Sequence, residues 1–340
     1  MALVRGAGRR TNLALLALLA AAFATGVFAF AIGSAWVGWV AIAHGVTGLG
    51  ILVLTPWKST ISARGLRRRP AGAWASIGLA AVVVLTIATG VGHSTGVLVS
   101  LGPATAMQVH VAAAVGSILL AGWHVLARKT VPRRTDVSRR NLLRGGVVLG
   151  GAAAGFAVVE GLVRATSLPG SDRRNTGSYE RGSGRPDEMP VTQWSNDDVP
   201  TVDVDAWSLL VADARGERSF GYDELASDRR AVRATLDCTG GWFAEQEWEG
   251  ISFADLLALD GHASSIEVTS VTGYARRLPV ADAGNLLLAT RVGGQPLSAG
   301  HGSPVRLVAP GRRGFWWVKW VERVALSDTP WWWQLPFPAA

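Results

Sequence analysis

The sequence predicts a multi-domain protein: an all-α transmembrane helix bundle followed by a mixed α+β, mostly β, domain. The chain of 340 residues is 49% hydrophobic and only 17% charged, which excludes the disordered and collagen-like classes. Residues 1–165 carry 16 Lys+Arg against 2 Asp+Glu, whereas the remainder carries 17 against 23. The basic residues lie between long apolar runs, a pattern that is typical of membrane topology. We therefore expect membrane lipid, and no nucleic acid, as a partner.

Four apolar stretches are long enough to cross a bilayer, which takes about 20 residues. They lie at residues 12–32, 36–57, 71–92 and 104–127, and they assign residues 1–130 to a four-helix transmembrane bundle. Lys and Arg precede the first stretch, join the second to the third and follow the fourth, while the other two connections have none. The positive-inside rule places both ends of this bundle in the cytoplasm of a multi-pass cell-membrane protein.

Residues 131–165 are predicted to hold an export signal and a fifth transmembrane helix. The run Ser138-Arg139-Arg140-Asn141-Leu142-Leu143-Arg144 resembles the twin-arginine signal, and the weakly apolar stretch 147–163 follows it. The polar part of the chain then lies outside the cytoplasm. A plain fifth span with positive-inside arginines is the alternative, and cleavage at residues 163–165 also stays open.

The polar part of the chain divides into a linker, a domain and a tail. Residues 166–190 are rich in Gly, Ser, Arg, Asp and Pro, which predicts a flexible linker without structure of its own. Residues 191–330 have the size of one domain, and residues 331–340 form a Trp/Pro-rich tail. Short β-like runs predict a mostly β domain without an internal repeat. Strands are expected at 207–212, 232–238, 265–271, 286–292, 304–308 and 315–326, with a helix at 252–259.

Three segments of this domain carry side chains that suit ligand or metal binding. Cys238, the single cysteine, ends a predicted strand and is followed by Gly240-Gly241, where the backbone can approach a ligand closely. A buried, inert thiol is the alternative. The second segment, residues 272–279, contains Tyr274. The third is the series His301-Gly302-Ser303-Pro304-Val305-Arg306, Pro310-Gly311-Arg312-Arg313-Gly314 and Val318-Lys319-Trp320.

This series, with a cysteine shortly before Gly-Trp, resembles the sulfite oxidase family of molybdopterin-binding domains. The resemblance covers roughly residues 189–328. It is greatest to the bacterial branch that includes the catalytic subunit of periplasmic methionine-sulfoxide reductase. It implies a sulfite-oxidase-like fold and a molybdenum–molybdopterin cofactor in which the Cys238 thiolate binds molybdenum, as a soft sulfur ligand would.

The resemblance also implies roles for five further residues. Arg306, His301 and Lys319 match family positions that hold the pterin and its phosphate, beside the glycine-containing turn that ends at Gly314. Taken singly, the two cations could instead lie on a strand face or in a surface ion pair. Tyr274 matches an active-site tyrosine and a proton donor. Thr239-Gly240-Gly241-Trp242 departs from the Asn-Arg-rich stretch of true sulfite oxidases, which argues against sulfite as the substrate.

Four of the six histidines, namely His44, His93, His110 and His124, lie in residues 1–165. Imidazoles inside membrane spans are costly and usually functional. The spacing of His110 and His124 resembles that of transmembrane b-type cytochromes. His44 and His110 lie at similar depth in the second and fourth spans, so we predict that they are the axial ligands of a haem b. A passive anchor with interhelical hydrogen bonds is the alternative. We expect His93 to be a loop residue.

Together, these features predict a membrane-anchored molybdenum oxidoreductase with its catalytic domain on the outer face. It would transfer an oxygen atom to or from a small sulfur or nitrogen oxide compound. Electrons would pass through the membrane domain, with a quinone or a cytochrome as the partner. Export by the twin-arginine route suits a domain that must load its cofactor before crossing. Two alternatives stay open: a cofactor-free exported binding module of the same fold, and a molybdoenzyme with a purely anchoring bundle.

Overall fold

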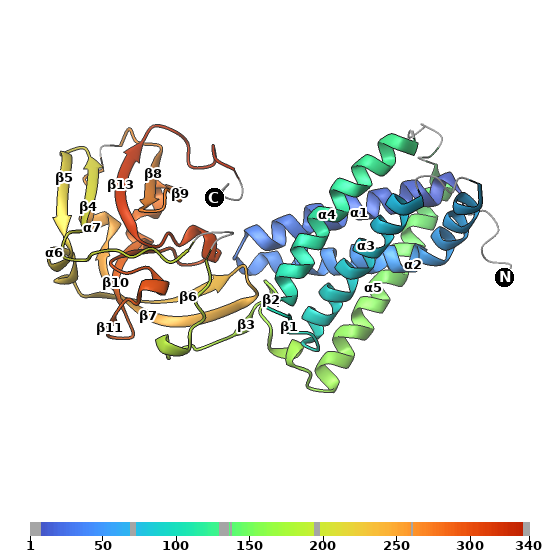
Figure 1. Ribbon diagram of the computed structural model, residues 1–340, viewed down its shortest axis with the longest axis horizontal. Coiled ribbons are helices and arrows are strands. Elements are labelled where there is room, and N and C mark those ends of the chain that lie inside the picture. Colours follow the sequence, from blue (N-terminus) through green and yellow to red (C-terminus); the bar gives the residue numbers. More distant parts are fainter. Residues whose placement is uncertain are drawn as a thin grey trace. The chain divides into compact units, whose positions relative to one another are not determined.

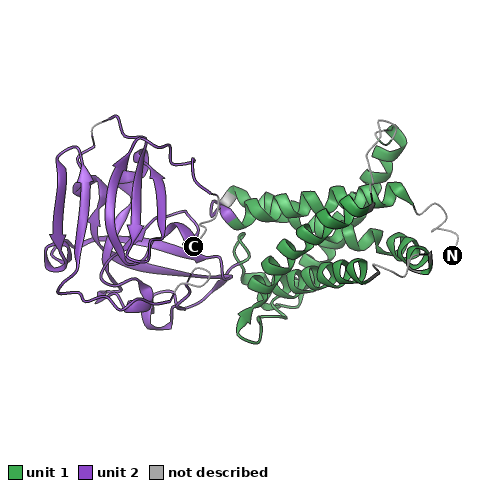
Figure 2. Cartoon of the chain, turned by 45° about the horizontal axis from the view of Figure 1, so that its top comes forward, with its two compact units in different colours: residues 1–30, 35–177 green, residues 31–34, 178–340 purple. Residues whose placement is uncertain are grey.

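The computed structural model describes residues 8–68, 73–128, 136, 138–193, 198–259 and 261–335. The chain divides into two compact units (Figure 2). The first comprises the residues up to Phe30 together with Ala35–Gly177, and the second comprises Ala31–Ser34 and the residues from Ser178 onward. The first unit is helical and the second is rich in strands (Figure 1), so the predicted fold class is confirmed.

Within the described residues, the first unit contains five helices that are long and apolar enough to cross a membrane. Their mean hydropathies lie between 1.6 and 2.4. Short elements join them: η2 (Ala35–Val37) precedes the second helix, and a hairpin of β1 (Ser100–Leu101) and β2 (Ala104–Thr105) precedes the fourth. The helices are α1 (Arg9–Ala31), α2 (Gly38–Arg68), α3 (Ala73–Thr95), α4 (Ala106–Arg128) and α5 (Arg139–Ala165).

Hydroxyl side chains inside these helices bond to the backbone of the preceding turn. Thr25 Oγ1 donates to Ala21 O at 2.7 Å, and Thr86 Oγ1 donates to Val82 O at 2.8 Å. Thr86 Oγ1 also lies 3.3 Å from Ser117 Oγ, which joins α3 to α4. A hydrocarbon environment offers no water to a hydroxyl, so these bonds let polar residues sit on apolar helices.

Helix α5 starts earlier than the weakly apolar stretch that predicts it. Ser138 is its N-cap residue, and the Ser138 hydroxyl accepts from Asn141 N at 3.4 Å. Arg139 and Arg140 therefore form the first turn of the helix. Sequence reasoning missed this because arginine has a good helix propensity that hydropathy does not register.

The prediction of an unstructured linker at residues 166–190 is wrong. The segment contains η4 (Pro169–Asp172), β3 (Tyr179–Glu180) and η5 (Pro186–Glu188). Strand β3 pairs in parallel with β7 (Trp242–Ser252), and Tyr179 N donates to Gly241 O at 3.0 Å. Because the neighbouring strand satisfies these backbone groups, a Gly/Ser/Pro-rich composition does not prevent order.

His93 is not a loop residue, contrary to expectation. Helix α3 continues past it to Thr95, and the His93 side chain is only 6% exposed. Its Nε2 donates to the backbone carbonyl of Gly177 at 2.8 Å. His93 therefore joins the end of α3 to the segment that follows α5.

Within its described residues, the second unit contains two sheets. One has the order β11-β10-β7-β3, with β12 also paired to β10 and β6 also paired to β7, and the other has the order β5-β4-β13-β8-β9. The remaining strands are β4 (Ser208–Asp213), β5 (Gly216–Gly221), β6 (Arg230–Cys238), β8 (Ser265–Ser270), β9 (Ala275–Pro279), β10 (Leu287–Val292), β11 (Gln295–Pro296), β12 (Arg306–Val308) and β13 (Val321–Ser327). The helical turns are α6 (Tyr222–Ala226), α7 (Phe253–Leu256), η6 (Val280–Asn285), η7 (Ala299–His301) and η8 (Gly314–Trp316).

The long hairpin of β6 and β7 positions the end of β6 that carries Cys238. Its register runs from Arg230 opposite Gly250 to Cys238 opposite Trp242. Alternate residues of β7 are buried, and Trp248 is fully buried in the core.

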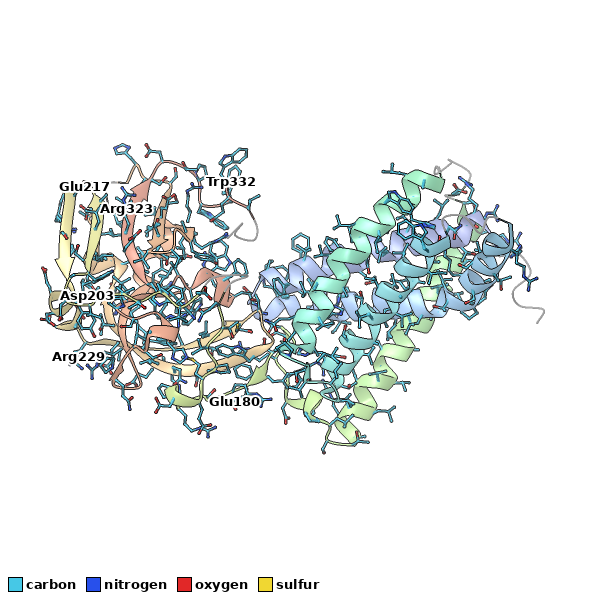
Figure 3. All side chains as sticks on the ribbon, in the orientation of Figure 1. Glu180, Asp203, Glu217, Arg229, Arg323 and Trp332 are labelled. Atoms are coloured by element: carbon cyan, nitrogen blue, oxygen red, sulfur yellow. The ribbon has the colours of Figure 1, made fainter. Side chains whose placement is uncertain are left out.

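The second sheet carries an exposed ion pair. Arg323 and Glu217, which Figure 3 labels, lie 4.0 Å apart, and their side chains are 40% and 67% exposed.

The strand predicted at residues 315–326 is only half correct. Its first part forms η8 and a bend, and β13 begins at Val321. Trp320, directly before β13, has a φ of 50°, which lies outside the β region and ends any strand that would arrive from the N-terminal side.

Asp213, at the end of β4, is a buried carboxylate with several donors. Its side chain is fully buried, and it accepts from Ala258 N at 2.8 Å and from Arg218 Nη2 at 2.7 Å. Arg215 donates to it through both its backbone and its side chain. Burial by itself would raise the pKa of Asp213, but these hydrogen bonds outweigh it, so the pKa lies well below its ordinary value.

We predict that Asp213→Asn lowers the stability of the second unit by about 2 kcal/mol at pH 7. The asparagine side chain replaces one acceptor oxygen by an NH₂ group, which would then face the N–H donors that Asp213 accepts from. A lowered folded-state pKa contributes stability above the ordinary aspartate pKa of about 3.9, and this contribution is lost as the pH falls through the folded-state value. The gap between wild type and variant should therefore narrow from pH 7 towards pH 3. Thermal unfolding of the full chain, followed by tryptophan fluorescence, measures it.

The exposed Asp187→Asn serves as the matched control and should unfold like the wild type. A stability gap between wild type and Asp213→Asn that stays constant with pH would contradict this account of Asp213.

Candidate functional site

All six residues that the sequence predicts for a site in the second unit line one pocket: Cys238, Tyr274, His301, Arg306, Gly314 and Lys319. They come from the end of β6, the turn between β8 and β9, η7, the start of β12, η8 and the bend before β13. Large aromatic side chains, among them Trp242, Phe315, Trp317 and Trp320, complete its walls.

Cys238 is the last residue of β6 and is only 8% exposed. The chain then turns back into β7, and Gly241, directly before β7, adopts the φ of 90° that this turn requires. The N–H of Gly240 donates to Cys238 Sγ at 3.3 Å. Burial raises the pKa of the Cys238 thiol, so without a metal the thiol is protonated at neutral pH. The N–H bond would favour the thiolate once a metal displaces the proton.

Gly314 allows the turn after β12 to pack against the backbone of Cys238. A Cβ at Gly314 would lie 3.2 Å from Cys238 Cα and 3.4 Å from Asp237 O, which is tighter than side chains normally pack. The glycine therefore acts here by allowing two backbones to approach closely.

A buried ion pair, which sequence reasoning missed, holds this region together. Arg313 and Asp237 are 1% and 3% exposed, and Arg313 Nη1 donates to Asp237 Oδ1. Arg313 Nη2 also donates to the carbonyl of Cys238 at 3.2 Å. Ser178 Oγ donates to Asp237 Oδ1 at 2.6 Å. No motif indicates such a pairing, because Asp237 and Arg313 are remote in the chain.

Arg306 is a buried cation that pairs with no carboxylate among the described residues. It is 1% exposed, and its Nη1 donates to His301 O at 2.9 Å. Its Cζ lies 5.1 Å from the centre of the Trp248 ring and 5.7 Å from the centre of the Trp317 ring. Its Nε has no hydrogen-bond partner among the described residues. Burial lowers the pKa of Arg306 to about 9, which still leaves it charged at pH 7.

His301 supports Arg306 through its backbone and is itself held by two partners. Its Nε2 lies 3.1 Å from Met189 O and its Nδ1 lies 2.9 Å from Ser298 Oγ. A carbonyl only accepts, so the network assigns the proton to Nε2. Burial lowers the pKa of His301, so the ring is neutral at pH 7. Both ring nitrogens are used inside the protein, and contact with a pterin would require one to exchange its partner.

The ammonium group of Lys319 likewise has acceptors for all of its N–H groups inside the protein. Its Nζ donates to Gly300 O at 2.6 Å, to Gln193 Oε1 at 2.8 Å and to Thr192 O at 3.0 Å. An ammonium has three N–H groups, so binding a phosphate would require Lys319 to release at least one of these acceptors.

The Tyr274 hydroxyl donates to the carbonyl of Phe315, which orients the ring at the pocket wall. Two residues further on, Arg276 is only 2% exposed. Arg276 Cζ lies 4.2 Å from the centre of the Trp316 ring. Burial lowers the pKa of Arg276 to about 10. Stacking on an aromatic ring explains how an arginine can be buried here.

In the first unit, the structure brings together the two histidines that were predicted as a pair. His44 on α2 and His110 on α4 have ring centroids 5.8 Å apart, with ring planes at 88°. His124 also lies on α4, as its spacing from His110 indicates. In the described part of the chain, no three His, Cys, Asp or Glu side chains gather as a metal cluster. The imidazole pair and the Cys238 thiol remain the metal-ligand candidates that the sequence predicts.

The pocket suits an anionic, sulfur-coordinated cofactor. Its described lining contains Arg306 and Lys319 but no carboxylate. The unpartnered Nε of Arg306 is a buried donor in need of an acceptor. Cys238 supplies one soft sulfur beside this positive charge, a combination that fits a metal held jointly by a thiolate and an anionic organic ligand.

Comparison with known proteins agrees with this chemistry. Residues 196–333 match the family of oxidoreductase molybdopterin-binding domains. Human mitochondrial sulfite oxidase is 31% identical over 166 residues, which cover 38% of this chain and 30% of that protein. The protein-methionine-sulfoxide reductase catalytic subunit of Gluconobacter oxydans is 27% identical over 238 residues, covering 60% of this chain and 73% of that protein.

One solved structure, that of the sulfane dehydrogenase SoxCD from Paracoccus pantotrophus, is 22% identical, with a TM-score of 0.37, and covers 38% of this chain and 40% of that chain. The chain spans about 30% of the length of the mammalian sulfite oxidases that it matches. Residues 196–333 therefore carry an oxidoreductase molybdopterin-binding domain, which is similar to the matching parts of sulfite oxidases and of a methionine-sulfoxide reductase catalytic subunit.

Proposed function

We propose that this protein is a membrane-anchored molybdenum oxidoreductase that transfers an oxygen atom to or from a small sulfur or nitrogen oxide compound. The observation that carries the proposal is the pocket in which Cys238 lies with Arg306, a buried cation that lacks a carboxylate. When bound, a molybdenum–molybdopterin group supplies two-electron redox chemistry and oxygen-atom exchange. The relatives named sulfite oxidase and methionine-sulfoxide reductase support this class of chemistry.

Different residues of the pocket would bind the cofactor and transfer protons. Cys238 would ligate the metal through sulfur, and Arg306 and Lys319 would balance the negative charge of the cofactor. Tyr274, whose ring lines the pocket, would hold or donate a proton at its hydroxyl. The tryptophans of the walls would exclude water and strengthen these electrostatic contacts.

A cofactor-free binding module of the same fold is the second candidate. A cofactor-free binding module does not need a buried thiol in its pocket, whereas a molybdoenzyme needs one as a metal ligand. The presence of Cys238 in the pocket therefore favours the enzyme. Molybdenum and pterin analysis of the purified, exported protein discriminates between them directly, since the binding module would contain neither.

We predict that Cys238→Ser lowers turnover by at least about 100-fold, because a hard hydroxyl replaces the soft metal ligand at nearly the same volume. Folding should change by only about 1 kcal/mol. Pterin should stay bound, since Arg306 and Lys319 are unchanged. The measurements are molybdenum EPR, pterin content and turnover on one preparation.

Thr235→Ser, on the same strand and outside the pocket lining, is the matched control and should behave like the wild type. Wild-type turnover together with an unaltered EPR signal in Cys238→Ser would remove the basis for Cys238 as the metal ligand.

We further propose that the helical unit spans the cell membrane and that the second unit lies on its outer face. The five apolar helices and the positive-inside distribution of Lys and Arg support this topology. Arg139 and Arg140, in the first turn of α5, would direct export of the folded domain.

The export proposal predicts that Arg139→Lys/Arg140→Lys leaves the second unit on the cytoplasmic side. Lysine keeps the positive charge but not the paired arginines. Accessibility of the C-terminal unit to protease in spheroplasts reports its side. Arg67→Lys/Arg68→Lys, another adjacent pair, should leave export unchanged. Normal external exposure in the 139/140 variant would show that α5 inserts without this pathway.

We also propose a haem b at His44 and His110 as the electron path between the outer domain and a quinone or cytochrome. Their 5.8 Å ring separation, on two helices apolar enough to span the bilayer, supports bis-histidine ligation. A purely anchoring bundle is the competing reading, and it would contain no haem.

The haem proposal predicts that His44→Ala or His110→Ala each abolishes the b-type absorption band of the detergent-purified protein, since either change removes one axial ligand. His93→Gln is the control, because glutamine can still donate to Gly177 O in place of Nε2. A band that survives both alanine changes would exclude this ligand pair, and a wild type without a band would favour the bare anchor.

A further inference from the structure

The two helical hairpins that carry His44 and His110 share a sequence pattern. Helix α1 contains Ala24-Thr25-Gly26-Val27, and helix α3 contains Ala88-Thr89-Gly90-Val91. In each case the next helix supplies the histidine. Each histidine is followed at the same spacing by a glycine and a tryptophan, which are Gly50 and Trp57 after His44, and Gly116 and Trp123 after His110. The two hairpins are therefore copies of one sequence pattern.

The two copies also make the same hydrogen bonds. His44 Nδ1 lies 2.8 Å from Ala22 O, and His110 Nδ1 lies 2.8 Å from Thr86 O. Each of these carbonyls belongs to the residue four positions before the glycine of its helix. The threonine next to the glycine donates to the same carbonyl in both copies, Thr25 at 3.0 Å and Thr89 at 3.1 Å.

The two glycines leave the space that the imidazole rings occupy. A Cβ at Gly26 would lie 3.0 Å from His44 Cε1, and a Cβ at Gly90 would lie 2.8 Å from His110 Cε1. Side chains essentially never pack at the shorter of these distances. Each ring can therefore lie against the neighbouring helix only because a glycine is present there.

The carbonyl contacts decide which nitrogen of each ring is free to bind a metal. A backbone carbonyl only accepts, so Nδ1 carries the proton in both rings and Nε2 keeps a bare lone pair. In the described residues no hydrogen bond is made by either Nε2. Two imidazoles on opposite sides of one metal would have centroids about 6 Å apart, since a metal–nitrogen bond is about 2.0–2.1 Å. The observed 5.8 Å is close to this separation.

We propose that Gly26 and Gly90 are equivalent positioning residues of one metal site, built by a duplicated helical hairpin. In each copy the glycine seats the imidazole, and the carbonyl one turn earlier orients it, so that both Nε2 atoms face the same metal. The inference rests on the proposed haem b at His44 and His110, and it adds that the two axial ligands have matched surroundings.

The experiment uses the full chain in detergent, produced without haem and titrated with haemin. Gly26→Ala and Gly90→Ala should each weaken haemin binding by about 10-fold or more, since loss of ligand orientation typically has this effect. The two effects should be of similar size, and the ferric low-spin EPR signal should shift or turn partly high-spin. Gly48→Ala on α2 is the matched control, because a Cβ there would meet nothing within 4 Å.

A second measurement does not depend on haem. Nitrogen NMR of ¹⁵N-histidine-labelled apoprotein should show His44 and His110 as Nδ1–H tautomers, and Gly26→Ala and Gly90→Ala should each perturb the facing ring. Far-UV circular dichroism and a monodisperse elution profile confirm that the variants are folded. If an alanine variant does not fold, the tautomers of the wild-type apoprotein alone provide the test. Nδ1–H tautomers at His44 and His110 support the inference, and any other tautomer overturns it.

The outcomes separate the two proposals. A wild type that binds no haem but shows both Nδ1–H tautomers defeats the haem proposal and keeps the positioning role of the helices. A wild type that binds haem, with Gly26→Ala and Gly90→Ala behaving like Gly48→Ala, overturns the positioning role. Nε2–H tautomers in the apoprotein also overturn it.

Discussion

The buried ion pair between Asp237 and Arg313 joins three remote stretches of chain where Cys238 ends its strand. Asp237 belongs to β6, Arg313 to the turn after β12, and Ser178 to the segment before β3, and all three are hydrogen-bonded together. Buried ion pairs add little net stability, because removing two charges from water offsets their attraction. Their value here is geometric, since Arg313 also holds the Cys238 carbonyl. The position of the thiol therefore depends on this pair.

The net charge of the pocket depends on which of the nearby arginines are paired with a carboxylate. Arg313 is paired with Asp237, and Arg312 is paired with Asp282 at 2.5 Å. Arg306 is buried beside two tryptophan rings, and among the described residues its hydrogen bonds go only to carbonyl oxygens. A buried cation without a counter-ion is costly, and an anionic ligand lowers that cost. The positive charge next to Cys238 is therefore left available for a bound anion.

The two units present metal-ligand candidates of opposite character. The strand-rich unit has one thiol in an asymmetric pocket whose six predicted residues come from six different segments. The helical unit has two imidazoles in matched surroundings, each bonded to a carbonyl of the preceding helix. In the proposed function, the first site handles two-electron chemistry on a substrate and the second passes single electrons. The second task needs no substrate pocket, only two fixed ligands.

The sequence by itself determined the five apolar helices and the mostly β second unit, and its resemblance to the sulfite oxidase family singled out six residues that line the pocket. Hydropathy and motif spacing are local properties, and a local pattern suffices to indicate them. The tertiary structure alone decided that residues 166–190 are ordered, because β3 is satisfied by hydrogen bonds to β7. It alone decided that Arg313 pairs with Asp237, and that Gly26 and Gly90 seat two imidazoles. These are contacts between residues remote in the chain, and only the folded chain selects such partners.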